Sequence, residues 1–215
     1  MNRGKKLLIN TFILGLGTLI PKLVSFIVLP LLTAYLTKSE YGSYDLITTM
    51  CFLFVPFVTL QIQTGAFRFL IEAKDNPIRS KTIITNIFAY IIPVSLISVC
   101  ILFFALYRFD LIIRVLISAY FFIEILYQTA GQIIRGMSNN KVYSLASIFS
   151  AVSNMISIVL FVWFLKLGLI GVLLSLIISI SLPALQMIIS GKILDFIDIK
   201  LIKKEVFKEL LKYSW

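Results

Sequence analysis

The chain has 215 residues, of which 60% are hydrophobic and 14% charged, and its mean hydropathy is +1.01. These values lie far outside the range of soluble domains and indicate an integral membrane protein. The sequence has no histidine, the usual general base and commonest metal ligand, and no Ser/Lys or paired-carboxylate arrangement replaces it. We therefore expect no enzymatic activity, no metal site and no cofactor. Cys51 and Cys100 fall in apolar runs, as buried thiols do, and do not suggest a disulfide framework.

Apolar runs of about 20 residues, the length that crosses the hydrocarbon core of a bilayer, recur with short polar breaks between them. They predict an all-α, polytopic membrane protein whose residues 1–190 form a bundle of six transmembrane helices. The start MNRGKK precedes a long apolar run without a small-residue cleavage site, so this run is a span and not a signal peptide. The expected spans are about 7–36, 45–70, 82–106, 111–136, 142–165 and 168–189.

The last segment, residues 191–215, mixes lysines with recurring apolar residues and predicts a basic amphipathic segment at the inner membrane surface. A further helix begins where the sequence stops, so we expect the chain to be incomplete. Fifteen of the 20 Lys and Arg residues lie in the N-terminal segment, after the second and fourth spans, and in this tail. Because short basic loops stay inside, both termini are predicted to be cytoplasmic. The same distribution explains the net charge of +10 without a nucleic-acid partner.

Polar residues recur at helical spacing in three of the expected spans, a pattern typical of helices that line a polar path. The stripes are Thr11, Gly15, Thr18, Lys22 and Ser25 in the first span, Tyr120, Glu124, Gln128, Gln132 and Arg135 in the fourth, and Tyr143, Ser147, Ser150, Asn154 and Ser157 in the fifth. In the fifth span, helix packing through small residues explains the stripe as well as cavity lining does. Prolines that permit bends lie inside the spans at Pro21, Pro30, Pro56, Pro93 and Pro183.

Lys22 most needs an explanation, because an ammonium at the centre of a span costs about 2.5–3.5 kcal/mol. Glu124 is expected at a similar depth in the fourth span. Two interpretations stay open. One is a buried Lys22–Glu124 ion pair that locks the bundle. The other is a functional cavity, in which Lys22 holds an anionic substrate group and Glu124 binds a driving proton or cation. The candidate cavity residues are Lys22, Arg135, Gln128, Thr18 and Ser25, and the candidate ion-coupling residues are Glu124 and Asp45.

The stretch PKLVSFIVLPLLTAYLTKSEYGSYDLI combines a basic residue in the first span, a proline near its outer end and a short EYGSYDL turn. It resembles the opening of the polysaccharide-repeat (O-antigen or capsule) flippases of the multidrug/oligosaccharidyl-lipid/polysaccharide (MOP) superfamily. FRFLIEAKD and IIRGMSNNKVYSLASI are similar to that family's second-span end and fourth-to-fifth connection, and the resemblance covers all 215 residues. The patterns are more specific for the superfamily than for a substrate.

The resemblance implies a MATE-like transporter of two six-helix lobes that opens alternately to each side of the bacterial cytoplasmic membrane. Its implied substrate is an oligosaccharide on undecaprenyl pyrophosphate, moved to the outer leaflet for surface polysaccharide biosynthesis. Lys22 matches the basic position of the family's first span and would face the pyrophosphate or an acidic sugar. Family members have about twice as many helices, so the chain resembles the N-terminal lobe. Its expected partners are membrane lipids, this lipid-linked oligosaccharide, and a second lobe or a second copy of the chain.

Two alternatives stay open at this point. A drug or cation antiporter of the same superfamily would favour acidic cavity residues, and Lys22 argues weakly against it. A membrane scaffold without transport would use the polar stripes for packing alone.

Overall fold

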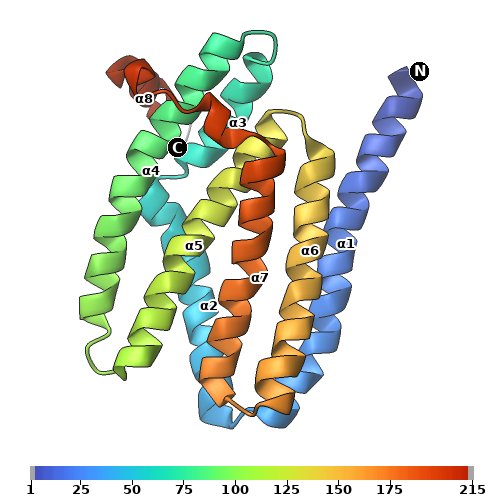
Figure 1. The fold of residues 1–215 in the computed structure, drawn as a ribbon, viewed down its shortest axis with the longest axis vertical. Helices are drawn as coiled ribbons and strands as arrows, with labels where there is room; N and C mark the ends of the chain where they lie inside the picture. The colour runs from blue at the N-terminus through green and yellow to red at the C-terminus, as the bar shows by residue number, and fades with distance from the viewer. Residues whose placement is uncertain (1–2, 213–215) are drawn as a thin grey trace.

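A computed structural model describes residues 3–212. Within this range the chain is helical and has no strand (Figure 1). The α-helices are α1 (Arg3–Tyr35), α2 (Lys38–Thr59), α3 (Ile62–Glu72), α4 (Pro77–Ala105), α5 (Leu111–Gly136), α6 (Asn140–Ile158), α7 (Gly168–Ser190) and α8 (Lys204–Lys212). A π-helix, η1 (Val159–Phe164), extends α6, and two 3-10 helices, η2 (Ile193–Phe196) and η3 (Ile199–Leu201), lie between α7 and α8.

Six helices in the described range are long and apolar enough to cross a membrane: α1, α2, α4, α5, α6 with η1, and α7. The predicted all-α fold with six spans is therefore confirmed, and α5 has the bounds expected from the sequence. The start of α1 and the tail lie at the same end of the bundle, the upper end in Figure 1. This end is named the tail end, and the opposite end, with the α1–α2 and α6–α7 turns, is named the turn end.

The second expected span, 45–70, is not one helix but is divided into α2 and α3. Leu60 and Gln61 both adopt the left-handed backbone conformation, with φ of 49° and 51°. The Leu60 amide donates to the Phe57 carbonyl (3.3 Å) and the Gln61 amide to the Pro56 carbonyl (3.2 Å), which is the Schellman pattern that ends a helix. Glycine usually occupies the left-handed position, and neither residue here is glycine, so the sequence held no signal for this break.

Helix α2 begins at Lys38, earlier than the expected residue 45. Thr37 is its N-cap and forms a capping box with Glu40. The Glu40 amide donates to the Thr37 hydroxyl (3.3 Å), and the Thr37 amide donates to the Glu40 carboxylate (2.9 Å). The other carboxylate oxygen of Glu40 accepts the amide of Leu169 on α7 (3.3 Å). Glu40 therefore ties the two turns of the turn end together.

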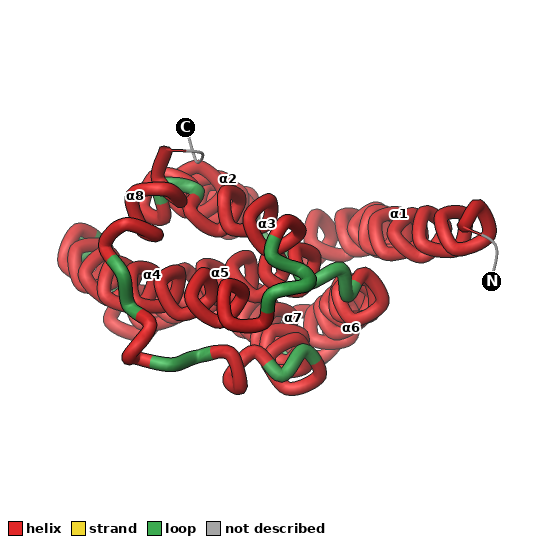
Figure 2. Tube along the Cα trace, turned by 90° about the horizontal axis from the view of Figure 1, so that it is seen from above, coloured by secondary structure: helices red, strands yellow, loops and turns green. Residues whose placement is uncertain are grey.

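Two hydrophobic clusters hold the helices together. The larger joins α2, α3, α4, α5, α7 and the tail, with Ile84, Ile125 and Leu173 fully buried. The smaller, named the turn-end cluster, consists of Val28, Leu32, Leu36, Ile158, Val162 and Val172. Seen from above, α1 lies at the edge of the bundle and points away from α4 and α5 (Figure 2). Helix α1 is therefore the peripheral span, and its second half packs into the bundle.

The expected amphipathic tail segment has one face of its helix α8 packed on the bundle, against α3 and α4, and its place at the inner membrane surface stays a prediction. Leu210 is 1% exposed, and the ring of Phe207 lies 5.1 Å from the ring of Tyr90 on α4. The apolar face of α8 is thus used inside the protein. Residues 213–215 of the expected segment lie outside the described residues.

Candidate functional site

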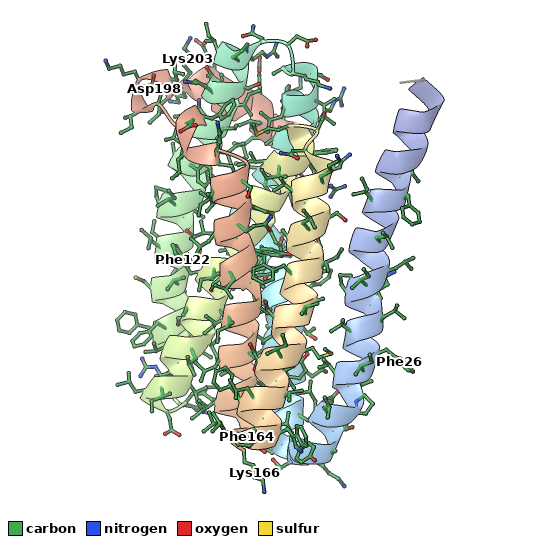
Figure 3. The ribbon with its side chains drawn as sticks, turned by 45° about the vertical axis from the view of Figure 1, so that its right-hand side comes forward. Phe26, Phe122, Phe164, Lys166, Asp198 and Lys203 are labelled. Atoms are coloured by element: carbon green, nitrogen blue, oxygen red, sulfur yellow. The ribbon has the colours of Figure 1, made fainter. Side chains whose placement is uncertain are left out.

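A cavity of about 730 Å³ lies between α1 and α6 and is also bordered by α2, α5 and α7. Its volume is in the range of small-molecule sites, roughly 300–1,000 Å³. In Figure 3 α1 stands beside α6, and the labelled Phe26 belongs to the part of α1 that borders the cavity. The polar lining consists of Lys22, Ser25, Tyr44, Tyr127, Tyr143, Ser147, Ser150, Asn154 and Ser179.

Helix α1 makes contacts that limit the cavity toward each end of the bundle. Toward the tail end, Gly17 packs so closely on α6 that a Cβ at this position would overlap the Ser144 hydroxyl. The same hydroxyl donates to the Ile13 carbonyl (2.6 Å). Toward the turn end, the turn-end cluster packs α1 against η1 and α7. The cavity is therefore confined to the middle of the bundle, where Lys22 lies.

Lys22 is the one charged residue on the described wall of the cavity. Its side chain is exposed, and in the part of the chain with described side chains no carboxylate lies within ion-pair distance of it. The facing walls contribute hydroxyl, phenol and amide groups, which donate or accept hydrogen bonds but carry no charge. This arrangement suits a ligand that combines an anionic group with many hydroxyls.

The predicted residues Thr18 and Ser25 have different places on α1. Ser25 lines the cavity next to Lys22, and its hydroxyl donates to the Pro21 carbonyl (2.9 Å). Thr18 is not among the lining residues, and its hydroxyl donates to the Gly15 carbonyl (2.9 Å). About two helical turns therefore separate Ser25, which reaches the cavity, from Thr18, which does not line it.

Arg135, at the tail end of α5, is one aromatic ring away from the cavity. Its guanidinium lies 5.2 Å from the ring centroid of Phe67 and 5.1 Å from that of Tyr143. Both distances are typical of cation–π contacts. Tyr143 lines the cavity and Arg135 does not. Any influence of Arg135 on a ligand therefore passes through the Tyr143 ring or acts by long-range charge.

Glu124 faces a second hollow, of about 360 Å³, between α2 and α5. The other residues of this hollow are Thr48, Thr49, Cys51, Phe52 and Tyr120. The side-chain amide of Gln128 donates to the Glu124 carboxylate (2.8 Å), so the predicted cavity residue Gln128 is a partner of the acid instead. Asp45 is exposed and lines neither hollow; its carbonyl accepts the Thr48 hydroxyl (3.1 Å).

The structure bears on the ion pair between Lys22 and Glu124 that the sequence left open. Lys22 and Glu124 line different hollows and form no ion pair, so the proposed Lys22–Glu124 lock is wrong. Their helices present the two side chains to different neighbours, which the depth of each residue in the membrane could not reveal.

In the fifth-span stripe, Tyr143, Ser147, Ser150 and Asn154 line the cavity, whereas Ser157 is buried in helix packing. Both explanations of this stripe therefore apply, to different residues.

Three polar lining residues lay outside the sequence prediction: Tyr44, Tyr127 and Ser179. Tyr127 is three residues after Glu124, and Ser179 is four residues after the buried Ser175, so helical spacing offered a signal for both. Tyr44 lay just before the expected start of the second span. Placing the start of α2 at the Thr37 capping box would have made it a span residue.

The two hollows have no lining residue in common, but they border adjacent turns of α2 and α5. Tyr44 of the cavity is one turn from Thr48 of the Glu124 hollow, and the Thr48 hydroxyl donates to the Tyr44 carbonyl (3.0 Å). Tyr127 is likewise one turn from Glu124 on α5.

Comparison with solved structures identifies the fold. A MATE transporter in complex with Br-NRF is 12% identical, with a TM-score of 0.77 over 97% of this chain and 53% of that one. An outward-facing multidrug resistance MATE family transporter of the MOP superfamily is 14% identical, with a TM-score of 0.74 over 94% and 49%. A MOP superfamily transporter from Pyrococcus furiosus is 17% identical, with a TM-score of 0.62 over 95% and 50%. The chain therefore has the fold of one half of these transporters and spans about half their length.

No curated protein matches the chain. The model of a family described as polysaccharide biosynthesis protein matches residues 7–215, nearly the whole sequence. With this match and its six spans, the chain is a multi-pass membrane protein that belongs to the polysaccharide biosynthesis protein family.

Proposed function

We propose that the chain is one six-helix lobe of a flippase that moves an oligosaccharide linked to undecaprenyl pyrophosphate across the bacterial cytoplasmic membrane. The observation that carries this proposal is the cavity beside α1, whose single described charge is the unpaired Lys22. The family match to polysaccharide biosynthesis supports the substrate class. Surface polysaccharide biosynthesis, such as that of an O-antigen or a capsule, is the process that uses such a carrier.

The charge of the cavity favours a phosphate-bearing ligand. An ammonium is a good partner for phosphate oxygens, and it binds more strongly away from bulk water because the local dielectric is low. Because Lys22 has no carboxylate partner, an anion that enters the cavity would supply the opposite charge that the ammonium lacks. The pyrophosphate of the carrier, or an acidic sugar, supplies that anion.

The opposite walls of the cavity suit the sugar part of the ligand. Tyr127 and Tyr143 offer aromatic rings and phenol groups, and Ser150 and Asn154 offer a hydroxyl and an amide. Sugars present hydroxyls in every direction, so they match a wall that both donates and accepts. The prenyl chain stays in the bilayer beside α1, where Leu23 is 64% exposed.

We assign ion coupling to Glu124 in the second hollow. The Glu124 carboxylate accepts a hydrogen bond from the Gln128 amide, and a carboxylate in such a setting can take up a proton or a monovalent cation. The adjacent turns of α2 and α5 that border both hollows would connect this uptake to the cavity. Asp45, on the exposed side of α2, stays a prediction for the same role, and Thr18 and Arg135 stay predictions for substrate contact.

A complete transporter requires more than this lobe. The solved relatives in fold are about twice as long, so a second lobe, or a second copy of this chain, would close the other side of the path. The lysine-rich tail end is proposed to face the cytoplasm, because short basic segments stay on that side.

The test of this proposal is a charge change at Lys22 in cells that depend on the protein for surface polysaccharide export. We expect Lys22→Glu to reduce export at least tenfold, because the anionic ligand would meet a like charge. Lys22→Arg should retain more export than Lys22→Gln. Lys166→Glu, at the turn end in Figure 3, is the matched control and should export normally. Normal export by Lys22→Glu at normal protein level would refute the assignment.

Water access to the cavity is tested separately. Ser25→Cys should react with a water-soluble thiol reagent, and added lipid-linked oligosaccharide should slow the reaction. Leu23→Cys, exposed on α1 but absent from the described lining, should react much more slowly because it faces lipid. Both variants are made with Cys100, the exposed native thiol, replaced by alanine. A Ser25→Cys that never reacts would contradict a wet cavity.

The Glu124 hollow favours a second candidate, a drug or cation antiporter. In that case Glu124 would hold the cationic substrate or its counter-ion, and Lys22 would be dispensable. Transport assays decide between the two: an antiporter loses activity in Glu124→Gln and keeps it in Lys22→Gln, whereas the flippase is impaired by both.

A further inference from the structure

The tail between α7 and α8 is fixed to α4 by two buried polar side chains. The Thr85 hydroxyl donates to the Phe196 carbonyl (3.2 Å) and accepts the Asp198 amide (3.0 Å). Asn86 donates to the Leu201 carbonyl (3.0 Å) and accepts the Lys203 amide (2.9 Å). Thr85 is 2% and Asn86 3% exposed. These four bonds hold the backbone of residues 196–203 in one register along α4.

This register leaves an apolar face pointing outward from the tail. Leu194 is 65% exposed, Ile197 37%, Ile199 79% and Ile202 52%. The apolar face of α8 packs inward, so these four residues are the exposed apolar part of the tail. They are named the tail patch. Figure 2 shows the connecting segment running along the outside of the bundle, past α4 toward α8.

The tail patch lies near the depth at which the hydrocarbon core begins. Helix α4 has 29 residues and is about 43 Å long at 1.5 Å per residue, against a core of about 30 Å. About 6 Å of α4 therefore extends beyond the hydrocarbon at each end if the helix is centred. Thr85 lies about 12 Å from the start of α4, so the segment that it holds runs along the boundary between acyl chains and headgroups.

Lysines surround the tail patch. Lys192, Lys200, Lys203 and Lys204 are all exposed, and in the described part of the chain no carboxylate forms an ion pair with any of them. The Asp198 carboxylate is engaged with the Lys200 amide (3.0 Å), where it caps η3. Exposed apolar side chains at the depth of the acyl boundary, with unpaired ammonium groups beside them, match the two parts of an anionic phospholipid.

We propose that the tail patch and its lysines form a binding surface for anionic phospholipid in the leaflet at the tail end. The isoleucines enter the acyl region, and Lys200, Lys203 and Lys204 contact the headgroup phosphates. The surface anchors the tail in the membrane. This assignment is independent of the cavity at Lys22 and of any transported substrate.

The lipid contact is tested with a fluorophore on Ile199→Cys in the complete 215-residue chain, with both native cysteines replaced by alanine. In phosphatidylglycerol-containing vesicles, lipids brominated on the acyl chain should quench this label and aqueous iodide should not. A label on Glu205→Cys, exposed on α8, is the control and should respond to iodide. Quenching of the Ile199→Cys label by iodide to the same degree would overturn the proposal. So would a label shielded from both quenchers, because protein would then cover the patch.

The charge requirement is tested by titrating the purified chain with phosphatidylglycerol and measuring bound lipid by native mass spectrometry. Each lysine near an anionic surface contributes about fivefold in affinity, so Lys200→Gln, Lys203→Gln and Lys204→Gln combined should weaken binding at least tenfold. Lys38→Gln with Lys166→Gln, at the turn end, is the control and should bind as the unmodified chain does. Unchanged binding by the triple variant would overturn the proposal.

Discussion

Helices α1 and α7 are both long apolar spans, yet 12% of the residues in the apolar window of α1 are buried, against 44% in that of α7. The reason lies in what each helix faces. Helix α7 packs in the larger hydrophobic cluster against α5, whereas α1 faces the polar wall of α6, and the buried apolar side chains described for α1 lie in the turn-end cluster. The contact between α5 and α7 is close-packed, and the cavity lies beside α1.

This difference shows how one small bundle can have a close-packed part and a part that is able to move. Close packing on the α5–α7 side resists deformation, because each shift there opens a void. On the α1 side, the tail-end half of the helix is held by the Gly17–Ser144 contact and the Ser144–Ile13 hydrogen bond. Movement that opens or closes the cavity therefore concentrates at α1.

The largest expected effect on the free energy of unfolding comes from a leucine-to-alanine substitution on α7, compared with the same substitution on α1. Leu173→Ala on α7 removes a side chain that is 0% exposed and should lower the free energy of unfolding by about 2–4 kcal/mol. Leu23→Ala on α1 removes the same atoms from an exposed position and should change it by about 0.5 kcal/mol or less. Thermal unfolding in detergent, followed by circular dichroism, measures both. Equal losses would remove the distinction.

A smaller effect is expected where the tail joins the rigid side. Asn86→Leu leaves the Leu201 carbonyl and the Lys203 amide without their partner, which should cost about 1–3 kcal/mol. The tail should then be cut by trypsin at Lys200 much faster than in the unmodified chain. Ser98→Ala, which loses only a bond to its own helix, is the control and should leave the cleavage rate unchanged. An unchanged rate in Asn86→Leu would mean that the Thr85 bonds and the packing of α8 hold the tail without Asn86.

At the turn end, where the two sides meet, Glu40→Ala should destabilise the protein by about 1 kcal/mol. The substitution removes the capping box with Thr37 and the bond to the Leu169 amide. Glu72→Ala removes an exposed ion pair with Arg68 and should cost about half as much or less. Chemical unfolding of the two variants compares them, and a larger loss for Glu72→Ala would contradict the role given to Glu40.

The smallest effect is expected at the α1–α6 contact. Ser144→Ala removes the bond to the Ile13 carbonyl and should cost about 0.5–1 kcal/mol. Because this bond holds the tail-end half of α1, amide hydrogen exchange should quicken there and not in α7. Ser147→Ala loses a bond to the Tyr143 carbonyl of its own helix and a hydrogen bond with Tyr127 of α5, neither of which involves α1, so it should leave exchange in α1 unchanged. Faster exchange in α7 would argue against α1 as the mobile element.

Much of the fold could be predicted because the membrane restricts it. Length and hydropathy alone identify the six spans, and the bounds of α5 were those expected. The break at Leu60 could not be predicted, because left-handed residues that are not glycine are held by surrounding packing and not by local preference. The early start of α2 could have been, since Thr37 and Glu40 form a recognisable capping box.

The candidate site was predicted in part. Helical spacing placed Lys22 and Ser25 on one face of α1, and the structure puts both on the cavity wall. The same spacing could not tell which neighbour each face meets. For that reason the sequence left open an ion pair of Lys22 with Glu124, which the structure does not form, and did not reveal that Gln128 is a partner of Glu124.

The sequence by itself determined that the chain crosses a membrane six times and which residues share a face of each helix, because both follow from hydropathy and the period of one helix. Only the tertiary structure decided which faces meet. That choice depends on the rotation and tilt of helices against one another, which many distant contacts set together. It separated the Lys22 cavity from the Glu124 hollow, turned α8 inward and left the tail patch exposed.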